Sequence, residues 1–142
     1  TGPYPGIIEL LRELKKHNIK MGIATNKVKS AADKLNEIYF EGLIDEVAGV
    51  EDGIIPKPDR CMIDSLMRRL NATTDETLYV GDSQVDVATA GNTGLDMVAV
   101  LWGFRTRKEL EESGAMVFID DPMEILDNVT AIGIHRWITV FL

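Results

Sequence analysis

The chain has 142 residues, of which 45% are hydrophobic and 27% charged, so its length and composition favour one soluble globular domain over a disordered chain. Its 15 Lys and Arg against 23 Asp and Glu give a net charge of −8, which argues against binding to nucleic acid or to an anionic membrane surface. The single cysteine, Cys61, excludes an intramolecular disulfide, and with no signal peptide or membrane span evident we expect a cytoplasmic protein.

Short apolar runs alternate along the chain with segments in which apolar residues recur at helical spacing. The first helix is expected after Pro5 and Gly6, with a basic last turn that suits the helix dipole. In chain order we expect a helix over 7–17, a strand over 19–24, a helix over 28–38, a strand over 46–50, a helix over 62–70, a strand over 77–80, a helix over 83–90, a strand over 97–101, a helix over 107–112, a strand over 116–119 and a helix over 122–127.

The alternation of strands and helices defines the expected fold class. Because the strands are near-continuous apolar runs, they are expected to form a mainly parallel sheet covered by helices on both faces. The sequence therefore predicts a Rossmann-like three-layer α/β/α sandwich over residues 1–130. Residues 131–142 form a tail that breaks the rhythm, although residues 138–142 (ITVFL) are strong strand formers.

Polar residues follow several of the predicted strands, at the edge where ligands bind in open α/β sheets. Thr25 and Asn26 follow the first strand, Lys57 lies in the loop before the third helix, and Asp82 ends the third strand with Asp86 one helical turn later. A hydroxyl, an amide and an ammonium group can hold phosphate oxygens, and a pair of carboxylates can hold Mg²⁺. Together these residues indicate phosphoryl transfer, in which positioning and charge neutralisation supply most of the catalysis.

Each of these residues also has a simpler structural interpretation. Either residue after the first strand could cap the following helix, and Lys57 could be a solvated loop lysine. Ser83 and Asp86 resemble a capping box, with the serine at the N-cap and the acid three residues later. That interpretation leaves Asp82 unexplained.

Three segments together resemble a known family. Residues 23–27 (IATNK), 57–58 (KP) and 81–86 (GDSQVD) are similar, in order and spacing, to the second, third and fourth motifs of haloacid dehalogenase-like (HAD) hydrolases. Residues 4–7 (YPGI) and 101–104 (LWGF) are similar to the phosphoglycolate phosphatase branch of that superfamily.

This resemblance implies a Mg²⁺-dependent phosphomonoester hydrolase that acts on a small phosphorylated metabolite. It implies that Thr25 and the backbone or side chain of Asn26 bind the phosphoryl group, and that Lys57 neutralises its charge. It further implies that Asp82 ligates Mg²⁺ directly, and that Asp86 either supports the metal site or orients Lys57.

The 142 residues do not contain the family's first motif, Asp-x-Asp-Gly-Thr, whose first Asp is the nucleophile, and they do not contain its helical cap. The complete enzyme would work through an aspartyl phosphate, whereas we expect this chain alone to be inactive. The alternative is a core that binds phosphate and metal without turnover. A receiver-like signalling domain would need an acidic pair after its first strand, and none is evident.

The strand that precedes the missing motif lies at the centre of the family's sheet, between the strands that here end at Ala24 and Val80. A gap there would leave two apolar strands with unpaired backbone groups. Residues 136–142 (RWITVFL) resemble the absent strand. We therefore hypothesise that the tail fills the central position, with a frayed tail as the alternative.

Overall fold

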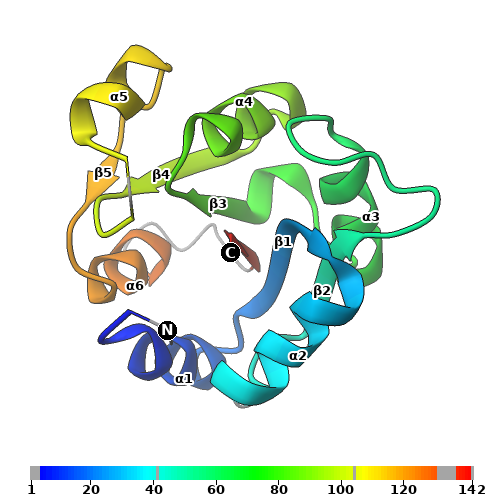
Figure 1. The fold of residues 1–142 in the computed structure, drawn as a ribbon. Coiled ribbons are helices and arrows are strands. Elements are labelled where there is room, and N and C mark those ends of the chain that lie inside the picture. The colour runs from blue at the N-terminus through cyan, green and yellow to red at the C-terminus, as the bar shows by residue number, and fades with distance from the viewer. Residues whose placement is uncertain (1–3, 41, 104, 131–136, 142) are drawn as a thin grey trace.

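The computed structural model describes residues 4–40, 42–103, 105–130 and 137–141, with side chains described as far as Asp127. Figure 1 shows how its helices and strands alternate around a single sheet. The elements are α1 (Ile7–Lys16), β1 (Lys20–Val28), α2 (Lys29–Tyr39), β2 (Glu46–Val50), α3 (Cys61–Leu70), the 3₁₀ turn η1 (Thr74–Glu76), β3 (Thr77–Gly81), α4 (Gln84–Thr93), β4 (Asp96–Val100), α5 (Arg107–Glu112), β5 (Phe118–Ile119), α6 (Met123–Thr130) and β6 (Trp137–Phe141).

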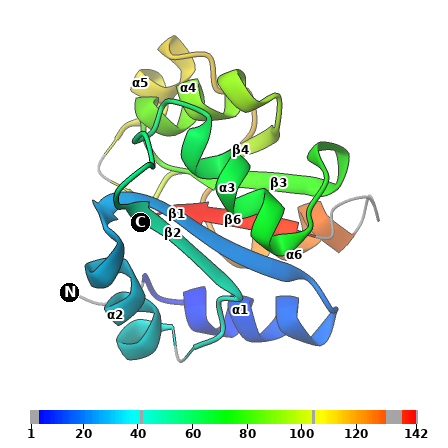
Figure 2. The same ribbon diagram turned by 90° about the vertical axis from the view of Figure 1, so that its right-hand side faces the viewer.

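The six strands form one parallel sheet in the order β2-β1-β6-β3-β4-β5. Helices cover both faces of this sheet, which confirms the predicted α/β/α architecture (Figures 1 and 2). No separate cap domain is present among the described residues, and none of the described helices is long and apolar enough to cross a membrane.

Two hydrophobic cores lie on opposite faces of the sheet because successive strand residues point to opposite sides. In β1, Ile23 packs with buried residues of α1, α2 and α6, whereas Ala24 packs with those of α3 and α4. In β3, Val80 belongs to the first core and Tyr79 to the second. Both faces of the sheet are therefore packed against an apolar core, and the polar candidate residues lie near the ends of the strands.

The C-terminal strand β6 lies in the middle of the sheet, between β1 and β3 (Figure 2). Val140 is level with Ile23 of β1 on one side and with Val80 of β3 on the other, and Phe141 is level with Ala24. This is the position that we hypothesised for the tail. Residues 131–136 and 142 of the tail lie outside the described residues.

The first strand and second helix differ from the prediction. β1 does not end at Ala24 but continues to Val28, which pairs with Val50 of β2 after an irregularity in register. The helix that follows begins at Lys29, and Ile38, expected on its apolar face, is 67% exposed. The predicted apolar stripe of this helix is therefore partly wrong, because Ala32 is the only residue of α2 that is buried.

The other helices and strands deviate mostly in length. α4 extends to Thr93 and stops at Gly94, whose φ of 73° suits glycine. β5 is only two residues long, with Phe118 level with Ala99 of β4 and Ile119 level with Val100. Met116, expected in this strand, is 89% exposed.

The central position of β6 can be tested by amide hydrogen exchange. We expect the amides of Thr139 and Val140 to exchange as slowly as those of Met21 and Ile23 in β1, because a central strand opens only with the sheet. Two-dimensional NMR spectra of the chain in D₂O would follow each amide. Exchange as fast as in the exposed loop at residues 51–53 would contradict this placement.

Candidate functional site

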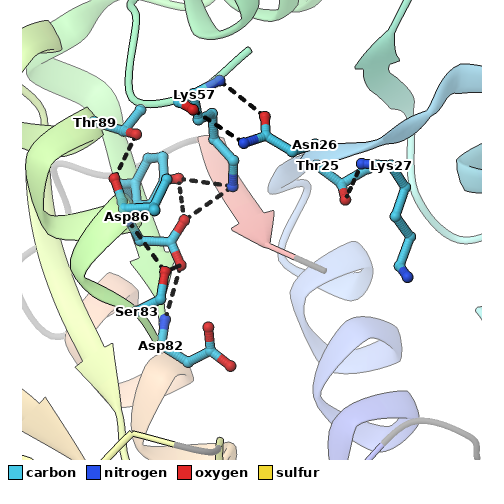
Figure 3. Close-up of polar contacts among 10 residues, drawn as sticks. Thr25, Asn26, Lys27, Lys57, Asp82, Ser83, Asp86 and Thr89 are labelled. Atoms are coloured by element: carbon cyan, nitrogen blue, oxygen red, sulfur yellow. Dashed lines mark hydrogen bonds and ion pairs between the residues drawn. The ribbon is translucent and has the colours of Figure 1, made fainter.

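The candidate site lies at the carboxyl edge of the sheet, where β1, β6 and β3 come side by side. Ala24 is level with Phe141 and Val140 with Val80, so Thr25 and Gly81 each follow the last residues that pair with β6. Thr25 and Asp82 therefore stand on opposite sides of the end of the central strand. Figure 3 shows the polar side chains that gather there.

The centre of the site is a buried ion pair between Lys57 and Asp86. Lys57 Nζ lies 2.9 Å from Asp86 Oδ1, and the two side chains are only 5% and 3% exposed. Lys57 comes from the loop between β2 and α3, and Asp86 from the first turn of α4. The interpretation of Lys57 as a solvated loop lysine is therefore wrong.

Asp86 accepts four hydrogen bonds, two on each carboxylate oxygen. Oδ1 accepts from Lys57 Nζ at 2.9 Å and from Tyr79 Oη at 2.6 Å, while Oδ2 accepts from the backbone N–H of Asp82 and from Ser83 Oγ, both at 3.1 Å. Burial alone would raise the pKa of Asp86, but the charge of Lys57 and these hydrogen bonds outweigh it and leave the pKa lowered. Asp86 is thus an ionised carboxylate whose acceptor positions are all used within the protein.

The capping interpretation accounts for only part of this geometry. Ser83 is the N-cap of α4, and its Oγ accepts from the backbone N–H of Asp86 at 3.3 Å. The Asp86 carboxylate, however, turns to Lys57 and Tyr79 rather than serving only the helix end. A complete capping box, which the prediction did not include, occurs instead at Thr106 and Glu109 of α5.

Asn26, near the carboxyl end of β1, holds the Lys57 loop against this strand. Its Nδ2 donates to the backbone carbonyl of Lys57 at 3.0 Å, and its Oδ1 accepts from the Lys57 N–H at 2.8 Å. The adjacent Thr25 is fully buried, and its Oγ1 accepts from the backbone N–H of Lys27 at 3.1 Å. Neither residue caps α2, whose N-cap is Val28 without a side-chain hydrogen bond.

Asp82 is the second acid at this edge, and its carboxylate lies apart from the Lys57–Asp86 pair (Figure 3). Burial, followed by the negative charge of Asp86, raises the pKa of Asp82 to about 6, although Lys57 acts in the opposite direction. A half-buried carboxylate beside another acid suits a divalent cation. Mg²⁺ commonly takes one or two carboxylates and fills its remaining positions with water and phosphate oxygens.

No cluster of three His, Cys, Asp or Glu side chains that could hold a metal occurs among the described residues. A divalent cation at this edge would therefore not find a cage of three or more such side chains among the described residues.

Two further residues, Tyr79 and Gly81, shape the site, and the sequence pattern gives neither of them a role. Tyr79 was assigned only to a strand, yet its buried hydroxyl donates to Asp86 and lies 3.4 Å from Lys57 Nζ. A tyrosine in an otherwise aliphatic buried strand was the available signal, since its hydroxyl must find a partner. Gly81 is needed for close approach, because a Cβ there would lie 2.4 Å from Asp86 Cβ.

Comparison with known proteins identifies the family of the chain. The family model of haloacid dehalogenase-like hydrolases matches residues 1–100 of the chain. The chain belongs to this family. Its predicted membership of the HAD superfamily, in the phosphoglycolate phosphatase-like branch, is thereby confirmed.

Three relatives illustrate the match. The phosphoglycolate phosphatase of Rhodospirillum rubrum is 36% identical over 121 residues, which are 83% of this chain and 49% of that protein. Pyrophosphatase PpaX of Bacillus mycoides is 30% identical over 133 residues, 92% of this chain and 61% of that protein. The crystal structure of a "putative phosphoglycolate phosphatase" from Lactobacillus delbrueckii subsp. bulgaricus has a TM-score of 0.87 at 34% identity and covers 90% of this chain and 54% of that one. This HAD chain spans about half the length of the curated relatives it matches.

The Tyr79 hydroxyl should stabilise the folded chain. We expect Tyr79→Phe to lower the free energy of unfolding by about 1–3 kcal/mol, because it removes a buried donor to an ionised carboxylate. Urea denaturation followed by circular dichroism measures this change. The matched control is Tyr4→Phe at a ring that is 45% exposed, which should change the free energy by less than about 0.5 kcal/mol. Equal effects of the two substitutions would contradict the assigned role of Tyr79.

The raised pKa of Asp82 predicts a pH-dependent effect of its removal. Between about pH 4 and pH 6 the folded chain holds a proton on Asp82 more tightly than the unfolded chain, so the stability contribution of this group falls as the pH rises through that window. We therefore expect Asp82→Asn to be about 1 kcal/mol more stable than the parent at pH 8, after allowance for solvent screening, and to lose this gain at pH 4.

Denaturation in EDTA at both pH values measures the difference, with Asp52→Asn at an exposed loop carboxylate as the control. A gain that is the same at pH 4 and pH 8 would contradict the assigned environment of Asp82.

Proposed function

We propose that this chain forms the core of a Mg²⁺-dependent HAD phosphomonoester hydrolase that acts on phosphoglycolate or a similarly small phosphorylated metabolite. The observation that carries the proposal is the buried ammonium group of Lys57, fixed at 2.9 Å by Asp86 at the carboxyl edge of the sheet. A cation held rigidly away from water is suited to a phosphoryl group, whose negative charge it neutralises without reorganisation. The relatives named above, phosphatases and a pyrophosphatase, support this substrate class.

The phosphoryl group would be held between Lys57 and the end of β1. The Thr25 hydroxyl can donate to one of its oxygens, and Lys57 Nζ neutralises its charge. The side chain of Asn26 already bonds at both ends to the Lys57 backbone, so we assign it the role of fixing the loop. Contact between Asn26 and the phosphoryl group would then come through its backbone.

The two acids would have separate tasks. Asp82 is the direct Mg²⁺ ligand, because its carboxylate stands apart from the ion pair and is destabilised by burial and by Asp86. Asp86 orients Lys57, because its four acceptor positions are already engaged within the protein. The bound cation would neutralise charge on the phosphoryl oxygens and on the attacking carboxylate.

In the complete enzyme, the nucleophile would be an aspartate that follows the central strand. β6 ends between Thr25 and Asp82, so a carboxylate placed directly after it would face the phosphoryl site. Its oxygen would attack phosphorus as the P–O bond to the leaving group breaks, and water would then hydrolyse the aspartyl phosphate. The 142 residues contain no Asp-x-Asp-Gly-Thr motif, so we expect no turnover by this chain alone.

A second candidate function is binding of phosphate and metal without turnover. The same absence of the motif favours it for this chain, while Thr25, Lys57 and Asp82 remain in place.

A paired assay tests the phosphate-binding site that both candidate functions require. Release of phosphate from phosphoglycolate and from an aryl phosphate is measured with and without Mg²⁺, and binding of inorganic phosphate is measured by ³¹P NMR. We expect binding without release, and we expect Lys57→Met to weaken binding tenfold or more because it removes a charge-assisted contact. Lys27→Ala is the matched control, because Lys27 is exposed and its side chain points away from Lys57 (Figure 3).

Two results would contradict these expectations. Metal-dependent release by this chain would show that another of its carboxylates is the nucleophile. Failure to bind phosphate, or equal loss in the Lys57 and Lys27 variants, would overturn both candidate functions.

A further inference from the structure

The carboxylate of Asp82 lies directly against the backbone of Gly103, which follows β4. A Cβ at position 103 would stand 2.4 Å from Asp82 Oδ2, 2.8 Å from its Cβ and 2.9 Å from its Cγ. All three of these atoms belong to the Asp82 side chain. Side chains do not approach this closely, so position 103 admits only glycine unless Asp82 moves.

The residue before this glycine is held by an aromatic contact. Trp102 packs against the core on one face of the sheet, and its ring stacks on Tyr4 with centroids 5.3 Å apart and planes 21° apart. Tyr4 is in turn fixed at the start of α1, where its carbonyl accepts from the N–H of Ile7 at 3.0 Å. A hydrogen bond and a ring contact thus connect α1, through Tyr4 and Trp102, to Gly103.

We propose that the bend at residues 101–103, held by the stacking of Tyr4 on Trp102, is a positioning element that presses on Asp82 and fixes the direction of its carboxylate. The inference rests on the proposed function in one respect, namely that Asp82 ligates Mg²⁺. A ligand side chain must be held within a fraction of an ångström to bind an octahedral ion well, and the backbone at Gly103 limits where the Asp82 carboxylate can lie. Gly103 and Trp102 are therefore positioning residues that act through Asp82.

The first test is a Mg²⁺ titration of the ¹⁵N-labelled 142-residue chain, followed through the amide signals of Asp82, Ser83 and Gly103. We expect Gly103→Ala to weaken Mg²⁺ binding tenfold or more. Gly91→Ala is the matched control, because nothing lies within 4 Å of a Cβ at this exposed helical position, and it should leave the affinity within twofold of the parent.

A milder perturbation tests the aromatic contact. Tyr4→Ala should weaken Mg²⁺ binding severalfold by releasing Trp102, whereas Tyr4→Phe should retain the stacking and the affinity. Because Tyr4 is 45% exposed, its truncation leaves the buried core intact even if the Gly103 variant folds poorly. Equal affinities of Tyr4→Ala and Tyr4→Phe would overturn the role of the stacking.

A double-mutant cycle tests the contact without metal. Asp82→Gly removes the three atoms nearest to a Cβ at position 103, so Gly103→Ala should lower the melting temperature in the parent but much less in the Asp82→Gly background. An equal loss in both backgrounds would overturn the inference.

The outcomes distinguish this inference from the proposed function. If Asp82→Asn binds Mg²⁺ as well as the parent, the assignment of Asp82 as ligand fails, while the cycle still decides the contact with Gly103. If Asp82→Asn abolishes binding and Gly103→Ala leaves it unchanged, the proposed function stands and the positioning role is overturned.

Discussion

The burial of one positive charge is the constraint on which the candidate site depends. An ammonium group taken out of water costs several kcal/mol unless it is paired and hydrogen-bonded, so Lys57 must be met by a carboxylate in a fixed place. Asp86 supplies that carboxylate, Tyr79 and Ser83 supply donors that hold it, and Gly81 provides the space that it occupies. A loop, a strand and a helix are thereby tied together at one point.

The sheet imposes the second requirement. In a parallel sheet with both faces covered, β1 and β3 cannot face each other across an empty position, because their backbone groups would have no partners. Here β6 pairs with both strands, and its end brings Thr25 and Asp82 to the two sides of one space. The site is thus a consequence of the order of the strands as well as of the residues in it. Lys57, which pairs with Asp86, also acts on the neighbouring Asp82: its charge lowers the pKa of that acid, although burial and the charge of Asp86 leave the pKa raised.

Local pattern was sufficient to predict the fold class, because buried parallel strands are short apolar runs and the helices between them have a distinct period. It failed for α2, where Ile38 follows the helical period and yet faces solvent, since the period alone does not say how much of a helix is buried. It also places the end of β1 too early, because polar Thr25 and Asn26 are typical of a strand end, whereas β1 continues to Val28.

The order of the motifs identifies the candidate residues of the site. The partner of Lys57, Asp86, lies 29 residues away along the chain, and only the family resemblance connects the two. Contacts such as Tyr79 with Asp86, or Gly103 with Asp82, depend on where the strands lie in space, and nothing in local sequence specifies them.

The most direct test of this account is a crystal structure of the chain grown with Mg²⁺ and phosphate. We expect the phosphate between Thr25 Oγ1 and Lys57 Nζ, and the cation on the carboxylate of Asp82, with the Lys57–Asp86 ion pair intact. Phosphate bound at another place, or a cation that displaces Lys57 from Asp86, would contradict the account.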